Sequence, residues 1–348
     1  MAEILYDAAL TPDQITFASR SIPTPANLTL TQNVPQRTIQ SDKISWGEVT
    51  RRNRMAKYRA YDGAIARAVR DEAATRDVAL APFSTSLVAG EYETLQKQYA
   101  LLQGGNKAAL VNAILDDVGT LTAYMQNRVE MALGQVLSTG KFTVNENRTM
   151  FEADYGVPAE NFFTAAAKWI ANPATAKAGD DLRAMRDLAV KSGMVPGRIW
   201  TSTAVVNALL RNAQVVGEAI GTQVGRTYLT RAELQVWLGN NMLPTQIVEV
   251  ETAMYDDEAG TDKRVFPQNL LVFTPESLSG VLEFVYGISA TAFELVQSNR
   301  SEMTFGQASG IVGMIVKDGP PFRQFTYTDA IGMPILYGAR QVVIGSVG

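Results

Sequence analysis

One stretch, residues 107–139, constrains the fold more than any other because it carries an unusually long helical pattern. Asn106 can cap the start of this helix and Gly140 can end it. At about 1.5 Å of rise per residue the helix is roughly 45–50 Å long, well above the usual length in globular proteins. Gly119 and Gly134 inside it can permit a bend or a close helix contact. The pattern consists of apolar residues in steps of three and four: Val111, Ile114, Val118, Leu121, Met125, Val129, Leu133 and Val136.

The rest of the chain mixes predicted helices and strands, which places the protein in the α+β class. A compact mixed unit is expected at 158–300, with an acidic hairpin turn at 256–262. Helices are predicted at Ala159–Ala171, Asp180–Lys191, Thr203–Asn212 and Arg231–Leu238. Strands are predicted at Arg198–Ser202, Gln246–Glu251, Leu270–Thr274, Leu282–Tyr286, Ile311–Val316, Phe322–Tyr327, Ile335–Leu336 and Gln341–Ile344.

The 348 residues include no Cys and no His. Disulfides, thiolate nucleophiles, cysteine-bound zinc and the Ser-His triad are therefore excluded, and no metal or cofactor site is predicted. Catalysis would have to use carboxylates, Lys, Tyr, Ser or Thr. The formal net charge of −4 argues against a protein whose whole surface grips nucleic acid.

Motifs for phosphate binding are near misses. Gly221–Thr227 is one residue short of a phosphate-binding loop and has Arg in place of Lys, while Gly140-Lys141 follows the long helix instead of preceding one. Asp180 and Asp181 are expected to stabilise the first turn of their helix through its dipole.

The beginning of the chain lacks the basic and apolar regions of a secretory signal, and no apolar run is long enough to span a membrane. We expect a soluble cytosolic chain.

Two segments contain too few apolar residues to bury themselves. Residues 1–36, punctuated by four prolines and rich in Thr, Ser and Asn, are predicted to form an extended arm with a short strand near residue 30. Residues 51–70 carry a local charge of +6, from one acid, Asp62, and seven bases: Arg51, Arg52, Arg54, Lys57, Arg59, Arg67 and Arg70. We expect a two-stranded excursion from the main body there. It could be a solvated loop, a contact with an acidic surface of a neighbouring subunit, or a nucleic-acid contact.

In this order of segments the chain resembles the tailed-phage major capsid proteins, most closely the lambda-type "protein E" family. The resemblance spans roughly residues 30–348 and depends on the order of individually weak motifs. They are Arg128–Leu133, Leu137–Val144, Asp180–Leu182, Arg198–Ser202 before a helix, Leu238-Gly239, Val265–Phe273, Tyr286-Gly287 and Met333–Ile335.

The resemblance implies an α+β capsid fold with five parts. They are an N-terminal arm (1–36), an extended β loop (37–85), a peripheral domain (86–157) with a spine helix at 107–139, an axial domain (158–295) and a return to the peripheral domain (296–348). It implies no catalytic residue and no cofactor.

The implied function is that of a major capsid protein. Hexamers and pentamers would form an icosahedral phage head around double-stranded DNA, without sequence-specific binding and without contact to a membrane. Assembly would take place in the host cytoplasm with a portal, a separately encoded scaffold and, in some members, a cement protein. Two alternatives are an encapsulin-like nanocompartment shell of the same fold and, more remotely, a carboxylate-dependent hydrolase with its site in 158–300.

The basic loop leads to a specific hypothesis about subunit contacts. We expect Arg51, Arg52, Arg54, Lys57 and Arg59 to lie across the spine helix of a neighbouring subunit. The acidic residues expected on the exposed face of that helix are Asp116, Asp117 and Glu130.

Overall fold

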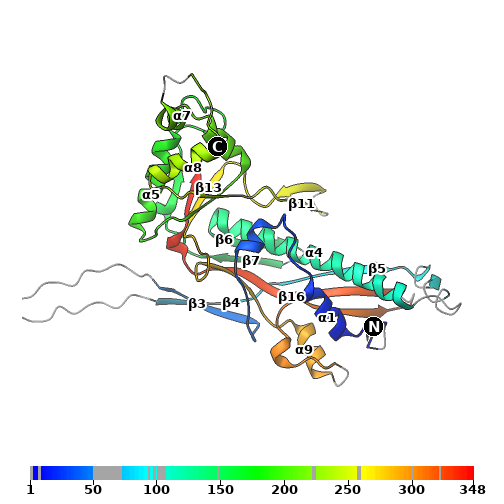
Figure 1. The fold of residues 1–348 in the computed structure, drawn as a ribbon. Coiled ribbons are helices and arrows are strands. Elements are labelled where there is room, and N and C mark those ends of the chain that lie inside the picture. The colour runs from blue at the N-terminus through cyan, green and yellow to red at the C-terminus, as the bar shows by residue number, and fades with distance from the viewer. Residues whose placement is uncertain are drawn as a thin grey trace, which may run out of the picture.

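The computed structural model describes residues 3–6, 9–49, 73–92, 95–96, 99, 107–146, 149–221, 225–256, 260–298, 301–320 and 323–348. An elongated body contains the long helix α4 (Lys107–Thr139) beside a β-sheet. A second unit, made of helices around another sheet, rises from one end of this body (Figure 1). A two-stranded ribbon projects from the body as well.

The sheet of the body has six strands. Five run in the order β1 (Glu3–Ile4), β15 (Val312–Asp318), β16 (Arg323–Leu336), β14 (Leu282–Tyr286) and β2 (Gln36–Thr38). The sixth, β5 (Pro82–Ala89), pairs with β16 over residues 324–331. All pairings are antiparallel except that of β14 with β2. The sheet is thus assembled from both ends of the chain and from the segment after the ribbon.

Helix α4 covers the predicted residues and buries the predicted stripe. Val118, Leu121 and Val136 are fully buried, and Gly140 ends the helix with a positive φ of 71°. Gly134 provides a close contact, because a Cβ atom there would lie 2.3 Å from the backbone oxygen of residue 265. Gly119 has open space around its Cα, so it makes no comparable contact.

The second unit is built on a five-stranded sheet, and we call it the five-stranded unit. Its strand order is β10 (Gln246–Glu249), β9 (Arg198–Thr201), β13 (Leu270–Thr274), β17 (Val343–Ser346) and β8 (Phe162–Thr164). Its helices are α5 (Ala178–Lys191), α6 (Thr203–Leu210), α7 (Ala213–Ile220) and α8 (Arg231–Asn240). Trp169, Leu182 and Phe273 are fully buried in a core separate from that of α4.

Smaller elements complete the described fold. Helix α9 (Ala290–Gln297) forms a small core with the residues that follow it, up to Val312, and with Ile4 near the N-terminus. Short 3-10 turns occur at Ala159–Asn161, Phe305–Gln307 and Ala339–Gln341. Three two-stranded ribbons are β3 (Lys43–Val49) with β4 (Ala73–Ala79), β6 (Lys141–Glu146) with β7 (Thr149–Asp154), and β11 (Ala253–Asp256) with β12 (Thr261–Arg264). The β11–β12 ribbon confirms the predicted hairpin.

The prediction of an extended N-terminal arm is wrong. Residues 12–21 form helix α1 (Pro12–Ser21), and the expected strand near residue 30 is instead helix α2 (Thr29–Asn33). Ile15 is fully buried against α4 and Ile315, and Leu30 is fully buried in the main core. A few well-placed apolar side chains are enough to fold this segment onto its own chain.

The prediction for the five-stranded unit needs four corrections. Residues 159–171 form a 3-10 turn and strand β8 instead of a helix, and α7 is an additional helix. Strand β14, expected within 158–295, pairs with β16 of the body. Strand β17, expected to return to the peripheral part, pairs with β13 and β8 of the five-stranded unit. The chain therefore passes from the five-stranded sheet to the six-stranded sheet between β13 and β14, and it returns between β16 and β17.

Candidate subunit interface

The β3–β4 ribbon makes its described contacts with the body at its base. Its strands pair from Lys43 opposite Ala79 to Val49 opposite Ala73, and Ile44 and Leu80 at the base are buried in the main core. Within the part of the chain that the structure describes, no further strand pairs with either one. An isolated two-stranded ribbon is marginally stable in water. A ribbon that leaves its own body in this way is therefore suited to lie against another molecule (Figure 1).

The predicted basic contact residues belong to the segment between these two strands. Arg51, Arg52, Arg54, Lys57 and Arg59 lie outside the described residues. The structure does show that the chain leaves the body through β3 and re-enters it through β4. The expected two-stranded excursion is thus confirmed for residues 43–49 and 73–79, and the contacts of the basic residues stay a prediction.

Two of the three predicted acidic partners lie where they could meet another subunit. Asp116 is exposed on the N-terminal half of α4, and Asp117 beside it is half-buried. The backbone oxygen of Asp116 accepts a hydrogen bond from the hydroxyl of Thr120. The carboxylate of Asp116 therefore projects from a regular helical surface.

The third predicted partner, Glu130, is not on the surface. It is fully buried, and its carboxylate accepts hydrogen bonds from the backbone N–H groups of Leu30 (2.9 Å) and Thr31 (2.6 Å) and from the Thr31 hydroxyl (2.6 Å). A buried carboxylate is tolerable only when such donors replace its hydration. Glu130 thus clamps the N-terminal segment to α4 within one subunit, and its prediction as an intersubunit contact is wrong.

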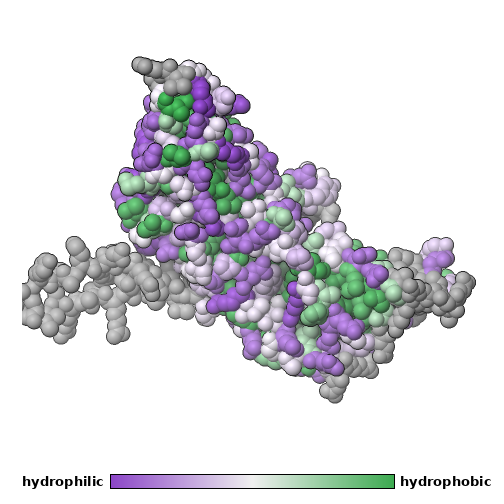
Figure 2. Space-filling model, in the orientation of Figure 1, coloured by the Kyte–Doolittle hydropathy of each residue, from purple (hydrophilic) through white to green (hydrophobic). Residues whose placement is uncertain are grey.

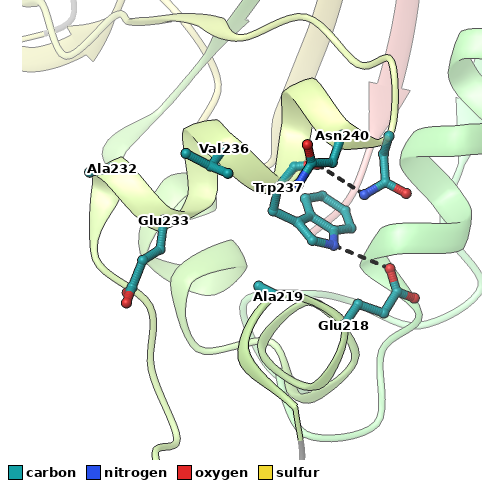
Figure 3. A pocket seen from close by; sticks show the side chains of 8 residues that line it. Glu218, Ala219, Ala232, Glu233, Val236, Trp237 and Asn240 are labelled. Atoms are coloured by element: carbon teal, nitrogen blue, oxygen red, sulfur yellow. Dashed lines mark hydrogen bonds between the residues drawn. The ribbon is translucent and has the colours of Figure 1, made fainter.

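A hollow of about 470 Å³ lies between α7 and α8 in the five-stranded unit. Figure 3 shows Trp237 at its centre, donating from its indole nitrogen to Glu218 (3.2 Å), while Glu233 lies on the other side. Glu218 also pairs with Arg183 (3.0 Å), and Glu233 pairs with Arg226 (2.8 Å). Each of the two carboxylates is therefore paired with a different arginine.

These carboxylates have the wrong properties for a hydrolase acid. Hydrogen bonds from Arg226 and from Thr230 lower the pKa of Glu233 to about 2, and hydrogen bonding to Arg183 lowers the pKa of Glu218. A general acid needs a raised pKa, as does one member of a catalytic carboxylate pair. Among the described residues no group of three or more acids could hold a metal ion. The site predicted for a hydrolase within 158–300 has no support in this hollow.

Apolar side chains are exposed on the body as well. Figure 2 shows them gathered where α1 meets the N-terminal half of α4. Phe17 of α1 is 74% exposed and Leu115 of α4 is 37% exposed, next to Asp116. An apolar patch beside an acidic residue is typical of a surface that contacts other proteins.

In the described part of the chain no helix is long and apolar enough to cross a membrane.

Solved structures share this architecture over nearly the whole chain. A protein of E. coli CFT073 described as a prophage capsid protein superposes with a TM-score of 0.62 at 12% identity, covering 100% of both chains. A phage-related protein from Bordetella bronchiseptica RB50 superposes with a TM-score of 0.52 at 11% identity, covering 95% of both. The fold, with its long helix and its two sheets, is therefore shared with a protein described as a prophage capsid protein.

The family of the chain follows from its sequence. The chain belongs to the family described as "Phage major capsid protein E", which matches residues 11–298. It is therefore a major capsid protein, a structural component of the virion. No curated protein matches its sequence. An encapsulin from Synechococcus elongatus PCC 7942 covers 94% of this chain with 91% of its own at a TM-score of 0.46 and 10% identity. Because the family that matches residues 11–298 is one of phage capsid proteins, the phage capsid is favoured over the nanocompartment.

Proposed function

We propose that copies of this chain form hexamers and pentamers that close an icosahedral phage head around double-stranded DNA, assembled in the host cytoplasm. The match of the capsid family to residues 11–298 carries this proposal. The β3–β4 ribbon supports it, because a ribbon whose described contacts with the body lie at its base needs a neighbour to cover it. The net charge of −4 suits a container that holds DNA without gripping it.

Within this shell the two sheets have separate places. The six-stranded sheet with α4 corresponds to the peripheral domain, and the five-stranded unit corresponds to the axial domain around each ring of subunits. The chain joins the two sheets where it passes from the five-stranded to the six-stranded sheet between β13 and β14, and where it returns between β16 and β17. A portal, a separate scaffold and a cement protein complete the proposed set of partners.

The basic segment provides the proposed contact between neighbouring subunits. Arg51, Arg52 and Arg54 of one subunit lie across α4 of the next, with Asp116 and Asp117 as their acidic partners. Glu130 has no part in this contact because its carboxylate is already bound within its own subunit. Complementary charge of this kind fixes orientation and register more than it adds affinity.

Charge reversal tests this contact. We expect the triple change Arg51→Glu, Arg52→Glu and Arg54→Glu to abolish shells in electron micrographs, while circular dichroism of the soluble subunit stays unchanged. Adding Asp116→Lys and Asp117→Lys to the same chain restores opposite charges at every interface and should recover shells. The matched control reverses three exposed lysines of the five-stranded unit, Lys168, Lys177 and Lys191. Normal particles from the triple variant would contradict the proposed contact.

The contents of the particles separate the proposed phage head from a nanocompartment. Particles purified from cells that produce phage should protect double-stranded DNA from added nuclease. Particles that protect a protein cargo and no DNA would favour the encapsulin-like alternative.

A further inference from the structure

One strand of the body has a long edge that no described strand covers. Strand β5 pairs with β16 on one side only. The other strands that end one of the two larger sheets, β1, β2, β8 and β10, have two to four residues, whereas β5 has eight. Soluble proteins keep free edges short because unpaired backbone groups attract another strand. The length of the β5 edge therefore requires an explanation.

Apart from a proline at its first position, strand β5 lacks the usual protection of an edge. Its residues are Pro82-Phe-Ser-Thr-Ser-Leu-Val-Ala89, and none is charged. Every other described strand of seven or more residues carries at least two charged side chains, as in Lys43 and Glu48 of β3 or Lys317 and Asp318 of β15. Charged residues on an edge strand prevent pairing with another chain. Their absence leaves β5 competent to pair.

A groove of about 380 Å³ lies where the first half of β5 meets α4 and the β6–β7 ribbon. Residues 82–85 of β5 line it, together with Tyr124 and Arg128 of α4 and with Phe142 of β6. Most of the lining residues are apolar, and Arg128 in the lining forms an ion pair with Glu146 (2.9 Å). The first half of β5 therefore borders an apolar groove that a further chain could partly fill.

We propose that β5 pairs antiparallel with β5 of a second copy of the chain, so that two six-stranded sheets join across a two-fold axis. In such a pair the strand lies opposite a second copy of itself, and the central residue lies opposite the same residue of the other copy. Any charge near the centre would therefore face a like charge. An uncharged edge strand is what this arrangement needs. Val88, which is 52% exposed, and Ala89 of one copy then lie beside the apolar groove at residues 82–85 of the other.

This pairing rests on the proposed shell and adds a contact of a different symmetry. A ring of hexamers or pentamers uses heterologous contacts, in which two different surfaces meet. Closed icosahedral shells also contain two-fold axes, where a surface meets its own copy. An antiparallel self-paired strand has two-fold symmetry by construction, so β5 is suited to join subunits of adjacent rings.

The absence of native cysteine makes a cross-linking test simple, because a single introduced Cys can form only an intermolecular disulfide. With the axis at the centre of β5, either Thr85 or Ser86 lies opposite its own copy, within the Cα separation that a disulfide allows. We expect either Thr85→Cys or Ser86→Cys to give covalent dimers in oxidised shells. The matched control is Val88→Cys, whose two copies would be at least about 13 Å apart along the strands and should stay monomeric.

A charge swap tests the same contact without a covalent bond. At the position that cross-links, a Lys variant or a Glu variant alone should lose shells, because like charges then face each other. Equal mixtures of the Lys and Glu chains should recover them, and thermal unfolding of each soluble subunit should match the unmodified chain. Shells that form normally but never yield a β5–β5 dimer would overturn this pairing and leave the proposed function intact. Failure of the unmodified chain to form shells would overturn both.

Discussion

The N-terminal segment 11–34 and the ribbon segment 43–79 are both predicted from the sequence to extend away from the body of the subunit, yet the structure places them differently. In the first, Ile15, Leu28 and Leu30 are fully buried within their own subunit. In the second, strands β3 and β4 pair with each other and with no further described strand, and Ile44 is buried where the ribbon meets the body. The difference shows that the positions of a few apolar side chains decide whether a segment packs onto its own subunit.

The largest expected effects come from removing each segment in turn. Deletion of residues 11–34 should leave a chain without a cooperative unfolding transition, because the buried partners of α4 and β15 are lost. Replacement of residues 50–72 by Asn-Gly should keep the fold, since Val49 and Ala73 already lie opposite each other and a two-residue turn can join them. The second variant should remain a folded, soluble subunit that forms no shells. Thermal unfolding measures whether each variant is folded, and electron microscopy measures whether it forms shells. Shells from the Asn-Gly variant would mean that residues 50–72 are not needed for contacts between subunits.

The clamp between the first segment and α4 should give the next largest effect. The change Glu130→Ala removes the acceptor of three buried donors and should lower the free energy of unfolding by about 3–5 kcal/mol. The exposed Asp116→Ala on the same helix is the matched control and should change it by less than about 0.5 kcal/mol. Urea titration measures both. Equal values for the two variants would mean that Glu130 does not hold the segment in place.

The two glycines inside α4 offer a smaller and more local test. Gly134→Ala should destabilise the subunit by about 1–3 kcal/mol, because the new Cβ would collide with the backbone at residue 265. Gly119→Ala meets open space and should stabilise it by up to about 1 kcal/mol. Changes of opposite sign in the free energy of unfolding, measured by urea titration, would confirm that α4 is in close backbone contact at Gly134 and not at Gly119. A gain at both positions would contradict the contact at residue 265.

Ion pairs within one subunit should have the smallest effect, and none on assembly. The pKa of Glu233 is lowered to about 2 by Arg226, so its contribution to stability is complete above the unfolded pKa near 4.3 and is lost as the pH falls toward 2. Glu233→Gln removes this titration, so the unfolding temperature should fall less steeply below pH 4.5 than in the unmodified chain. The variant should assemble normally at pH 7, in contrast to charge reversal at Arg51, Arg52 and Arg54.

Regular local patterns made part of this fold predictable. The spine helix at 107–139 was predictable to the residue because its apolar residues follow one period throughout. Helix α1 also had a local signal: Thr11, Pro12 and Gln14 form a capping box with Pro at the first position, a pattern that the mainly polar composition obscured. Composition alone was misleading there.

The remaining errors concern contacts between residues distant in sequence. Glu130 meets Thr31 across 99 positions, and no pattern near Glu130 distinguishes a buried carboxylate from an exposed one. The sheets to which β14 and β17 belong were mispredicted for the same reason, since the partner of a strand depends on the whole topology. The free edge of β5 could be recognised only once its pairing with β16 was known.

Sedimentation velocity of the 348-residue chain measures whether copies of it build a closed shell by contacts with one another. We predict particles of megadalton mass, visible as closed shells in negative stain, which the Asn-Gly replacement of residues 50–72 converts to small soluble species. A full-length chain that sediments only as a 37.8 kDa monomer, under conditions in which it is folded, would contradict the account.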